Sequence, residues 1–480
     1  MSARSVFISG GGPAGLAAAL LFDQLGWEEI VLAERRAGPT DFEKNKSFNY
    51  LIDKRSQRLL ERLGLLERLP DVGVATREFV ATTLGTDGQA VTKSVPIIDA
   101  NRPTCYWTTR RALLTMLFEA IEERASPRIK LLYRHRVARL QRGGEGRVRV
   151  EVSAADEGDT ITFGPDLILA CDGLNSAVRA GLADQPEITP GAFDMIATPS
   201  LSTGLNYKVL NLPARFETRN AEAAVNDPTM SYIIPSRHKD PRKACALFAF
   251  PVSDPSHPRS VNLIREKDHE LWQLAQSEEL YGFLDDAFPQ LAIRDLVSLD
   301  EAEDFVALKP GAFPAPQYCK RLHAALGPAN ARTDVLLIGD AAHAFPPDLG
   351  LGVNAALQDV DMLARHLERE PDLAAAAIGY AREREPEARD LAWLVTNVFP
   401  EQYNHRPWRL KRWIAGFLLR QGLNRIAPAL FKRPGFFLTQ DPNLSFGEMR
   451  SAIEQTDRNI AILGIAVLAA LLAAAVFLLR

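Results

Sequence analysis

Two glycine-rich segments, far apart in the chain, carry the residue types that hold phosphate-like ligands. The first is FISGGGPAGLAAAL (7–20), and the second is GDAAHAFPPDLGLGVNAALQD (339–359). Each follows an apolar run and precedes a helical pattern. A loop that opens a helix presents free backbone N–H groups and the positive end of the helix dipole. The chain therefore has two candidate sites for an anionic or nucleotide ligand.

The first segment has the G-x-G-x-x-G spacing at Gly10, Gly12 and Gly15. In this motif the first glycine makes a tight turn, the second lets a pyrophosphate approach, and the third lets helix and strand pack. Glu34 ends the next apolar run, where an acid accepts hydrogen bonds from a ribose. Arg35 is placed either to touch phosphate or to stay solvated. The context predicts dinucleotide binding rather than an ordinary glycine-rich turn.

The second segment suits the other end of such a ligand. Asp340, at a strand end, can bind a sugar hydroxyl, and Pro347 stiffens the loop. Gly350 and Gly352 let backbone N–H groups approach a flat ring, and the helix that follows favours negative charge there. His343 is interpreted as a loop-packing or flavin-side residue rather than a base. Both loops can thus serve one molecule of FAD, one at the pyrophosphate and one at the ribityl chain and isoalloxazine.

These motifs need a parallel sheet to position them. The order strand, glycine loop, helix, strand at the N-terminus predicts an α/β fold with a Rossmann-type FAD-binding domain. We expect that domain at 1–75, 106–183 and 301–370, interrupted by substrate-domain strands at 76–105 and a mostly β substrate domain at 184–300. A helical extension follows at 371–459.

Composition narrows the class of protein. A chain of 480 residues holds two or three domains. A net charge of −4 argues against a nucleic-acid partner. The four cysteines are scattered without a CxxC pair, which suggests neither a metal site nor a disulfide framework. No basic-then-apolar leader precedes the first strand.

The C-terminal part predicts membrane attachment. Residues 460–479 are twenty uncharged, mostly apolar residues, enough to span a bilayer. The alternative is a buried core helix. Residues 407–433 carry seven Lys or Arg and no acid, with interleaved aromatics, which suits either a membrane surface or packing on the acidic body. We expect a single-pass tail anchor with a cytosolic catalytic part, in the mitochondrial outer membrane or endoplasmic reticulum if the cell is eukaryotic.

Taken together, GGGPAG, Arg110 ahead of a helix, CDGLNSAVR (171–179) and GDAAHxxxPxxGxGxN resemble the single-component FAD-dependent aromatic hydroxylases over nearly the whole chain. Within that family the chain most resembles the kynurenine hydroxylases, through SFNYLIDKRSQRLLERLGLLERL (47–69), GLNYKVLNLP (204–213), the segment around Asp390, Leu391 and Ala392, and the membrane-seeking C-terminus. The resemblance adds these cofactor residues to the glycines, Glu34 and Arg35: Arg110, Val137, Asp172, Asp340, Val353 and Asn354.

The resemblance implies a monooxygenase. In that family NADPH docks transiently and reduces bound FAD, O2 adds at flavin C4a, and the hydroperoxide transfers one oxygen atom to an electron-rich ring. No side chain need act as acid or base, and the flavin-side loop with Pro347, Gly350 and Gly352 has to exclude water. The implied partners are an aromatic substrate, O2, NADPH and a membrane.

The substrate side departs from the family. Kynurenine hydroxylases hold the amino-acid carboxylate with an Arg and a Tyr. Phe79 stands at the Arg position, with Arg77 two residues away, and Tyr106 is the nearest tyrosine. An expected Asn is Val395, with Asn397 close by. The flavin loop has Asp348-Leu349 where the family often has two Phe, and Leu351 in place of Gln. These changes suggest an altered carboxylate clamp.

Three functions follow from this pattern. The first is hydroxylation of kynurenine, and the second is the same flavin chemistry on an apolar phenolic, quinone or terpenoid partitioned in the membrane. The third is a flavoprotein scaffold or sensor that no longer hydroxylates, against which the intact Asp340, Gly350 and Gly352 argue. Halogenation is disfavoured because the chain has no Trp-x-Trp-x-Ile-Pro segment. A reductase is kept as a less favoured alternative function.

Overall fold

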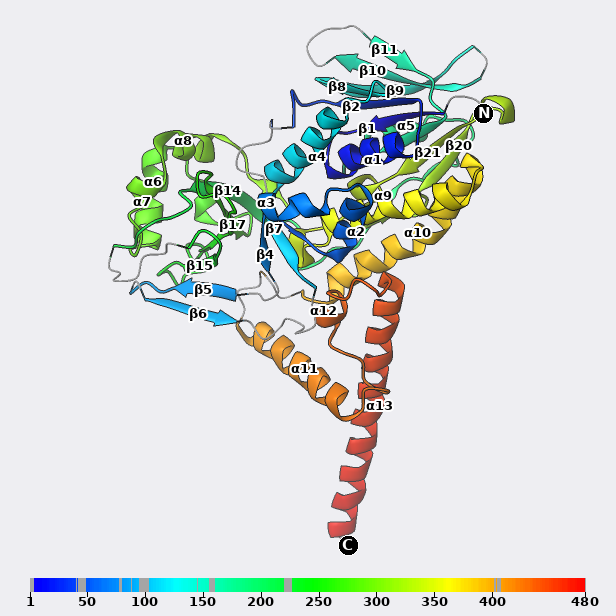
Figure 1. Ribbon diagram of the computed structural model, residues 1–480. Helices are drawn as coiled ribbons and strands as arrows, with labels where there is room; N and C mark the ends of the chain where they lie inside the picture. The colour runs from blue at the N-terminus through cyan, green and yellow to red at the C-terminus, as the bar shows by residue number, and fades with distance from the viewer. Residues whose placement is uncertain are drawn as a thin grey trace.

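The chain folds into an α/β body, a β-rich lobe beside it, and a helical C-terminal part that ends in a projecting helix (Figure 1). The computed structural model describes residues 4–39, 41, 49–76, 80–87, 89–94, 103–144, 146–154, 160–219, 227–400, 403 and 407–479.

A six-stranded sheet forms the centre of the α/β body, in the order β20-β21-β12-β1-β2-β8. Its strands are β1 (Ser5–Ser9), β2 (Glu29–Glu34), β8 (Ile129–Tyr133), β12 (Leu167–Ala170), β20 (His323–Leu326) and β21 (Thr333–Leu337). All neighbours pair in parallel except β20 with β21. The near-continuous apolar runs of β1 and β12 follow from burial on both faces, as is typical of parallel sheets.

Helices cover one face of this sheet and a small second sheet covers the other. Helices α1 (Pro13–Gln24), α4 (Arg110–Arg124) and α9 (Gly352–Arg369) pack beside one another (Figure 1). The second sheet comprises β9 (His135–Arg142), β10 (Val148–Ala154) and β11 (Thr160–Phe163). Phe163 from β11 packs on Phe7 from β1, with ring centroids 5.6 Å apart. The predicted Rossmann-type architecture is confirmed.

The β-rich lobe is built on a seven-stranded sheet in the order β18-β14-β17-β16-β15-β5-β6. Its strands are β5 (Val80–Leu84), β6 (Ala90–Ser94), β14 (Asn206–Leu212), β15 (Ser231–Pro235), β16 (Ala246–Ala249), β17 (Arg259–Arg265) and β18 (Gly311–Ala312). Helices α6 (Ser277–Ala287), α7 (Ile293–Leu296) and α8 (Leu299–Ala307) pack on it. The boundary predicted at residue 301 falls inside α8, whose Ala302 and Phe305 lie in the core of this lobe.

Smaller elements join the two parts. A three-stranded sheet contains β3 (Asn49–Ile52), β7 (Cys105–Thr109) and β4 (Gly73–Thr76), and another contains β13 (Met195–Ala197), β19 (Gln317–Cys319) and β22 (His343–Ala344). The short helices are α2 (Lys54–Arg62), α3 (Leu69–Val72) and α5 (Ala177–Leu182). Single helical turns lie at η1 (Leu66–Arg68), η2 (Glu270–Trp272), η3 (Ala329–Ala331), η4 (Gly339–Ala341) and η5 (Pro347–Leu349).

The C-terminal part is helical, as expected. It comprises α10 (Leu373–Asn397), α11 (Pro407–Ile426), α12 (Gly435–Leu438) and α13 (Phe446–Leu478). Helix α11 docks through Trp413 and Phe417, because Trp413 donates to Val398 O at 3.2 Å and the Phe417 ring packs at a tilt against Phe437, with centroids 5.2 Å apart. Its other side exposes Trp408, Ile414, Leu418 and Leu419. Packing on the body, one of the two predicted environments, accounts for the face with Trp413 and Phe417. The exposed apolar face would suit the other, a membrane surface.

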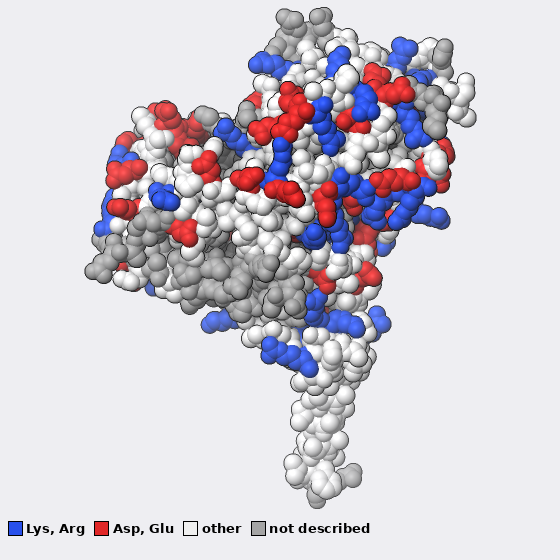
Figure 2. Space-filling model, in the orientation of Figure 1, with Lys and Arg blue, Asp and Glu red and all other residues white. Residues whose placement is uncertain are grey.

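Helix α13 is a single 33-residue helix whose apolar end stands clear of the body. It is long and apolar enough to cross a membrane, and the apolar window of the helix has no buried residues. In the space-filling view this stem is white, and Lys and Arg gather where it leaves the body (Figure 2). Arg420 of α11 pairs with Asp457 of α13 at 2.6 Å, which ties the two helices together at that level.

Candidate functional site

The two glycine-rich segments lie at one edge of the central sheet. Strand β12 separates β1 from β21, and the three strands are parallel. Their carboxyl ends therefore lie side by side, and the loops that leave them start from one edge. Two segments distant in sequence are thus positioned to hold different parts of one extended ligand.

The first loop has the geometry that its glycines predict. Gly10 has φ of 100°, and a Cβ there would lie 2.5 Å from Cys171 O on the neighbouring strand. A Cβ on Gly15 would lie 1.9 Å from Gly10 O, so only glycine lets α1 pack this close to the turn. A Cβ on Gly12 meets no atom within 4 Å. The second glycine therefore faces open space, as a pyrophosphate cradle requires.

Glu34 and Arg35 follow at the end of β2. Glu34 is buried, and its Oε2 accepts a hydrogen bond from Gly11 N at 2.7 Å while Oε1 accepts one from Arg36 N at 2.9 Å. The carboxylate is thus fixed against the glycine turn. Arg35 is exposed. The acid is located where the ribose of a bound dinucleotide would meet it.

The helices that begin at the two loops start alike. Neither α1 nor α9 has a side-chain cap at its N-terminus, and the short helices α3, α7 and α12 lack one too. A side-chain oxygen caps each of α2, α4, α5, α8, α10 and α13. Uncapped first-turn N–H groups are donors available to an anion. A Cβ on Gly352, the first residue of α9, also meets no atom within 4 Å.

Three polar side chains lie around these loops. Arg110 begins α4 and hydrogen-bonds Tyr50; burial raises the pKa of Tyr50, and the Arg110 charge opposes that rise. Asp340 has an exposed side chain by surface area, yet burial raises its pKa, and Asp359 adds to the rise while His343 and Arg110 oppose it. The Arg110 charge acts on both Tyr50 and Asp340, so these three side chains lie near one another.

Two other predicted cofactor residues are engaged by the protein itself. One oxygen of Asp172 accepts from Ser9 Oγ at 3.0 Å and from Ala177 N at 2.9 Å, so it holds the start of α5. Asn354 is buried; its Nδ2 donates to Leu51 O and Gly350 O, and its Oδ1 accepts from Asp53 N and Ser56 Oγ. Asn354 thus fixes the shape of the flavin-side loop, and only its backbone is left to meet a cofactor.

A buried charge cluster supports the second loop from behind. Asp359 Oδ2 accepts from Gly339 N at 2.7 Å and contacts His343 Nε2 at 2.9 Å, and Asp359 Oδ1 lies 2.5 Å from Arg384 Nε. The side chains of His343, Asp359 and Arg384 are all fully buried. Burial alone raises the pKa of Asp359, but Arg384 and His343 outweigh it and hold the pKa below its ordinary value. His343 is a loop-packing residue here.

The cluster continues into the C-terminal helix. The guanidinium groups of Arg384 and Arg55 lie over the Phe446 ring, at the start of α13, with Cζ 5.6 and 5.4 Å from its centroid. Glu387 of α10 accepts the backbone N–H groups of Phe446 and Gly447. Helix α13, which carries the apolar stem, therefore contacts the buried charge cluster that supports the flavin-side loop.

The predicted substrate residues are more scattered. Arg77 and Phe79 lie outside the described residues. Tyr106 is half-buried on β7, opposite Ala75 of β4. Asn397 is exposed at the end of α10, and its amide donates to Trp393 O of the same helix, while Val395 is buried. Val137 is buried on β9, and Val353 is half-buried in the first turn of α9.

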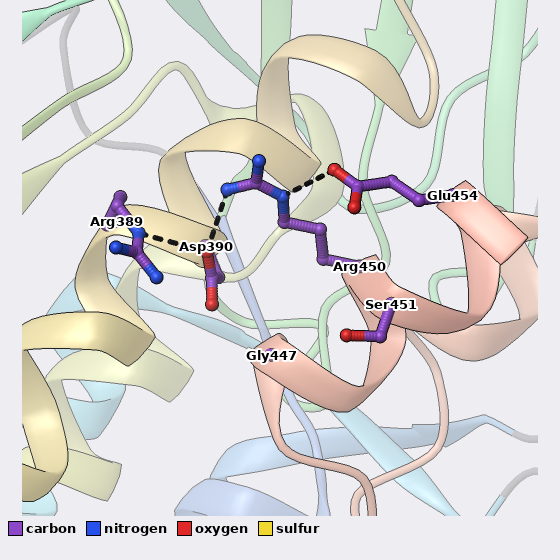
Figure 3. Close-up of a pocket in the computed structure, with 6 residues that line it drawn as sticks. All are labelled: Arg389, Asp390, Gly447, Arg450, Ser451 and Glu454. Carbon is purple, nitrogen blue, oxygen red and sulfur yellow. Dashed lines mark hydrogen bonds and ion pairs between the residues drawn. The ribbon is translucent and has the colours of Figure 1, made fainter.

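A polar hollow of about 450 Å³ lies elsewhere, between α10 and α13 (Figure 3). It contains Arg389, Asp390, Arg450 and Glu454, and none of the predicted cofactor residues lines it. Arg450 contacts Asp390 at 2.9 Å and Glu454 at 2.8 Å, and Figure 3 shows these groups turned toward one another. The Asp390 segment therefore docks α13 onto α10.

Sequence reasoning did not single out Asp359 or Arg384. Asp359 was the last residue of the quoted second loop, but its partners come from η4, β22 and α10. A charged residue on the apolar face of a helix is the one signal that could have identified Asp359. Arg384 sits in a charged stretch, REREPEAR (382–389), in which no single residue stands out.

A family model described as "FAD binding domain" matches residues 3–266 and 326–392, which is more than half of the chain. The chain belongs to this FAD-binding family. Kynurenine 3-monooxygenase from Caenorhabditis briggsae is 25% identical over 441 residues, 86% of each chain. The enzyme of the same name from Salinispora arenicola is 27% identical over 402 residues, 82% of this chain and 79% of the other.

Solved structures agree on the fold. The chain matches a probable FAD-dependent monooxygenase, PqsL of Pseudomonas aeruginosa, with a TM-score of 0.55 at 19% identity, covering 86% of this chain and 99% of the other. It matches 2-methyl-3-hydroxypyridine-5-carboxylic acid oxygenase with a TM-score of 0.58 at 18% identity, covering 84% and 94%. The protein is an FAD-dependent monooxygenase of the aromatic hydroxylase family.

Proposed function

We propose that this flavoprotein is a membrane-anchored hydroxylase that inserts one oxygen atom from O2 into an electron-rich aromatic ring, with NADPH as the electron donor. The observation that carries this proposal is the pair of uncapped helices, α1 and α9, whose N-termini share one edge of the sheet. When bound, FAD supplies the redox chemistry that activates oxygen.

The chain's own residues bind and orient. The turn at Gly10 to Gly15 holds the pyrophosphate, and Glu34 accepts from the adenosine ribose. Arg110 and Asp340 hold the linking phosphates and ribityl hydroxyls. The first turn of α9 directs N–H groups at the pyrimidine edge of the flavin, where reduction leaves negative charge. Asp359 holds Gly339, so this loop keeps its shape.

The apolar end of α13 is the proposed anchor. Its length and hydropathy suit one bilayer crossing, and the exposed Trp408, Ile414 and Leu418 of α11 suit the lipid surface beside it. The aqueous side that holds the body is proposed to be the cytosol. NADPH is proposed to visit from that side without a second dinucleotide fold.

Kynurenine is the first candidate substrate, supported by the names of the relatives above. The second is a neutral phenolic or related ring that partitions into the membrane. The stem and the exposed face of α11 favour the second, because they hold the body next to lipid. Arg77 and Tyr106 stay predictions for an amino-acid carboxylate.

The test is NADPH oxidation by full-length, detergent-solubilised protein reconstituted with FAD, with and without L-kynurenine, followed by mass analysis of the product. We expect substrate-stimulated oxidation and a product one oxygen atom heavier. A yellow, folded protein that consumes no O2 with kynurenine or with a panel of membrane-soluble phenols would disprove the proposed reaction. Oxidation of NADPH without O2 uptake would indicate a reductase instead.

A further inference from the structure

The flavin-side loop has two different sides. Phe345, Leu349 and Leu351 pack into the apolar cluster formed by α10, α12 and α13. Asp348, between them in η5, is also buried, with 5% of its surface exposed. Its Oδ1 has no hydrogen-bond partner among the residues that the structure describes. The loop thus packs apolar residues on one side and also buries a carboxyl oxygen that accepts no hydrogen bond from the described residues.

The surroundings of Asp348 belong to the β-rich lobe rather than to the FAD-binding body. Its other oxygen is hydrogen-bonded by Ser202, which is 2% exposed. Ser202 sits in the turn that leads into β14, where Leu205 N donates back to Ser202 O at 3.2 Å. Asp348 therefore links the flavin-side loop to the β-rich lobe. This lobe is the part of the fold that was predicted to bind the substrate.

Aromatic side chains gather at this junction. Phe313 N donates to Leu205 O at 2.9 Å, and the Phe313 ring lies 5.2 Å from Tyr207 and 5.7 Å from Tyr403. Leu205 and Ile264 complete an aromatic cluster defined by these five residues. Tyr403 is coupled to Asp348, since the carboxylate charge and, above all, burial raise the pKa of its hydroxyl. Tyr403 is also the one member that does not lie in or beside a strand of the lobe.

No cation among the described residues is paired with Asp348. Burial raises the pKa of its carboxyl to about 7, and the Ser202 hydrogen bond opposes that rise. Among the described residues no Lys, Arg or His contributes to this pKa. A buried carboxylate without a counter-charge stabilises a hydrogen-bond donor or a cation and repels an anion.

We propose that Asp348 contacts the substrate and accepts a hydrogen bond from a hydroxyl or amino group on its aromatic ring, which lies beside the aromatic cluster. The inference rests on the proposed function and names the substrate class of the same site. It predicts that a neutral hydrogen-bond donor on the substrate ring meets Asp348 and that a carboxylate of the substrate does not. The amino-acid end of a kynurenine-like substrate would have to lie elsewhere.

For a phenol the assignment defines a proton step. The O–H bond of the substrate breaks, the proton moves to Asp348 Oδ1, and the electron pair stays on the ring oxygen. The carboxyl becomes neutral, and the ring becomes more electron-rich, which is the direction that aromatic hydroxylation needs. Once the product has formed, its ring oxygen takes the proton back and Asp348 is again a carboxylate. For an aromatic amine only the hydrogen bond forms.

The experiment compares two probes that differ in the donor alone. The probes are 4-ethylphenol and 4-ethylanisole, titrated calorimetrically into full-length, FAD-loaded protein between pH 5.5 and 8.5, a range chosen around the carboxyl. We expect the protein to prefer the phenol, and the preference to grow as pH rises through about 7. Asp348→Leu should remove about 10- to 100-fold of that preference, the value of a hydrogen bond to a charged group, with anisole binding unchanged.

Two further variants separate contact from scaffolding. Asp348→Asn keeps the Ser202 hydrogen bond and the side-chain shape but loses the charge, so the preference should become independent of pH. Ser202→Ala removes the interaction that lowers the carboxyl's pKa, so the pH profile should move to higher pH. A purely structural Asp348 would change neither profile.

The proposal fails if wild-type protein binds both probes equally or binds neither, or if Asp348→Asn reproduces the wild-type profile. These outcomes differ from a failure of the proposed function, which shows as absence of O2 uptake in the wild-type protein whatever its binding preference.

Discussion

Asp359→Asn should loosen the flavin-side loop although Asp359 lies behind it. Asp359 Oδ1 lies 2.5 Å from Arg384 Nε, with both side chains fully buried. The variant keeps the volume but leaves the Arg384 guanidinium without a counter-charge. Removing one partner of a buried pair costs about 3–5 kcal/mol. Urea unfolding followed by circular dichroism should show a loss of that size, and FAD should dissociate at lower urea than from wild type.

A matched control comes from the neighbouring helix. Glu383 pairs with His366 and Arg365 at the surface of α10, with 42% of its side chain exposed. Because exposed pairs contribute about 0–1 kcal/mol, Glu383→Gln should change unfolding far less than Asp359→Asn. Equal losses in the two variants would refute the reasoning from burial.

The double variant Asp359→Leu/Arg384→Met separates stability from FAD binding. Replacing a buried pair with apolar residues is often neutral or stabilising, so unfolding should recover toward wild type. Gly339 N then has no acceptor, which costs about 1–3 kcal/mol at the loop itself. FAD affinity should stay reduced. Full recovery of FAD affinity would show that the Asp359–Gly339 bond does not shape the loop.

The pH dependence has a defined sign. The pKa of Asp359 is lower in the folded protein than in the unfolded chain, so its stabilising contribution is present above the unfolded value of about 3.9. The contribution is lost as pH falls through the folded pKa. The unfolding free energies of wild type and Asp359→Asn should therefore converge below about pH 4, and a constant gap down to pH 3 would contradict the assignment.

Three other changes test the cofactor and membrane assignments. Gly15→Ala should destabilise the fold and weaken FAD binding, because its Cβ would lie 1.9 Å from Gly10 O; wild-type melting and FAD content would contradict this. Gly12→Asp should leave the melting temperature of the apoprotein near wild type but abolish FAD binding, because a carboxylate would fill the open space where pyrophosphate lies; a yellow variant would overturn the role of Gly12. Truncation after Asn459 should move the protein from the membrane pellet to the supernatant, and continued pelleting would place the membrane contact in α11.

The sequence was sufficient where one motif lies inside one βα unit. Gly10, Gly12 and Gly15 carry their own geometry, since strand, turn and helix are contiguous. The position of the second loop at the same edge of the sheet was also predictable, because Asp340 and Gly352 follow a strand of the same parallel sheet. Boundaries were less accurate, and the predicted change of domain at residue 301 divides α8, because amphipathic helices also pack on the β-rich lobe.

Side-chain partners between distant segments could not be predicted. Asn354 looked like a cofactor ligand, but both polar atoms of its side chain bond to Leu51, Asp53, Ser56 and Gly350. Asp348 looked like a departure from a family pattern, and its meaning depends on Ser202 and Tyr403, which come from other elements. Hydrophobic periodicity fixes which face of a helix is buried, but it does not say which distant polar atom meets which.

Because α13 is continuous, it fixes the distance between the catalytic body and the proposed membrane surface. From Phe446, which contacts Arg55 and Arg384, to the apolar stem there is one unbroken helix, and Asp457 on it pairs with Arg420 of α11. A helix rises about 1.5 Å per residue, so the distance between the catalytic body and the lipid is counted in residues between Asp457 and the first apolar turn. Seven added residues, two turns, would lift the body about 10 Å with its facing direction nearly kept. If the stem anchors the protein as proposed, α11 would then no longer reach the headgroups, and a lipid-dissolved substrate would have to cross water.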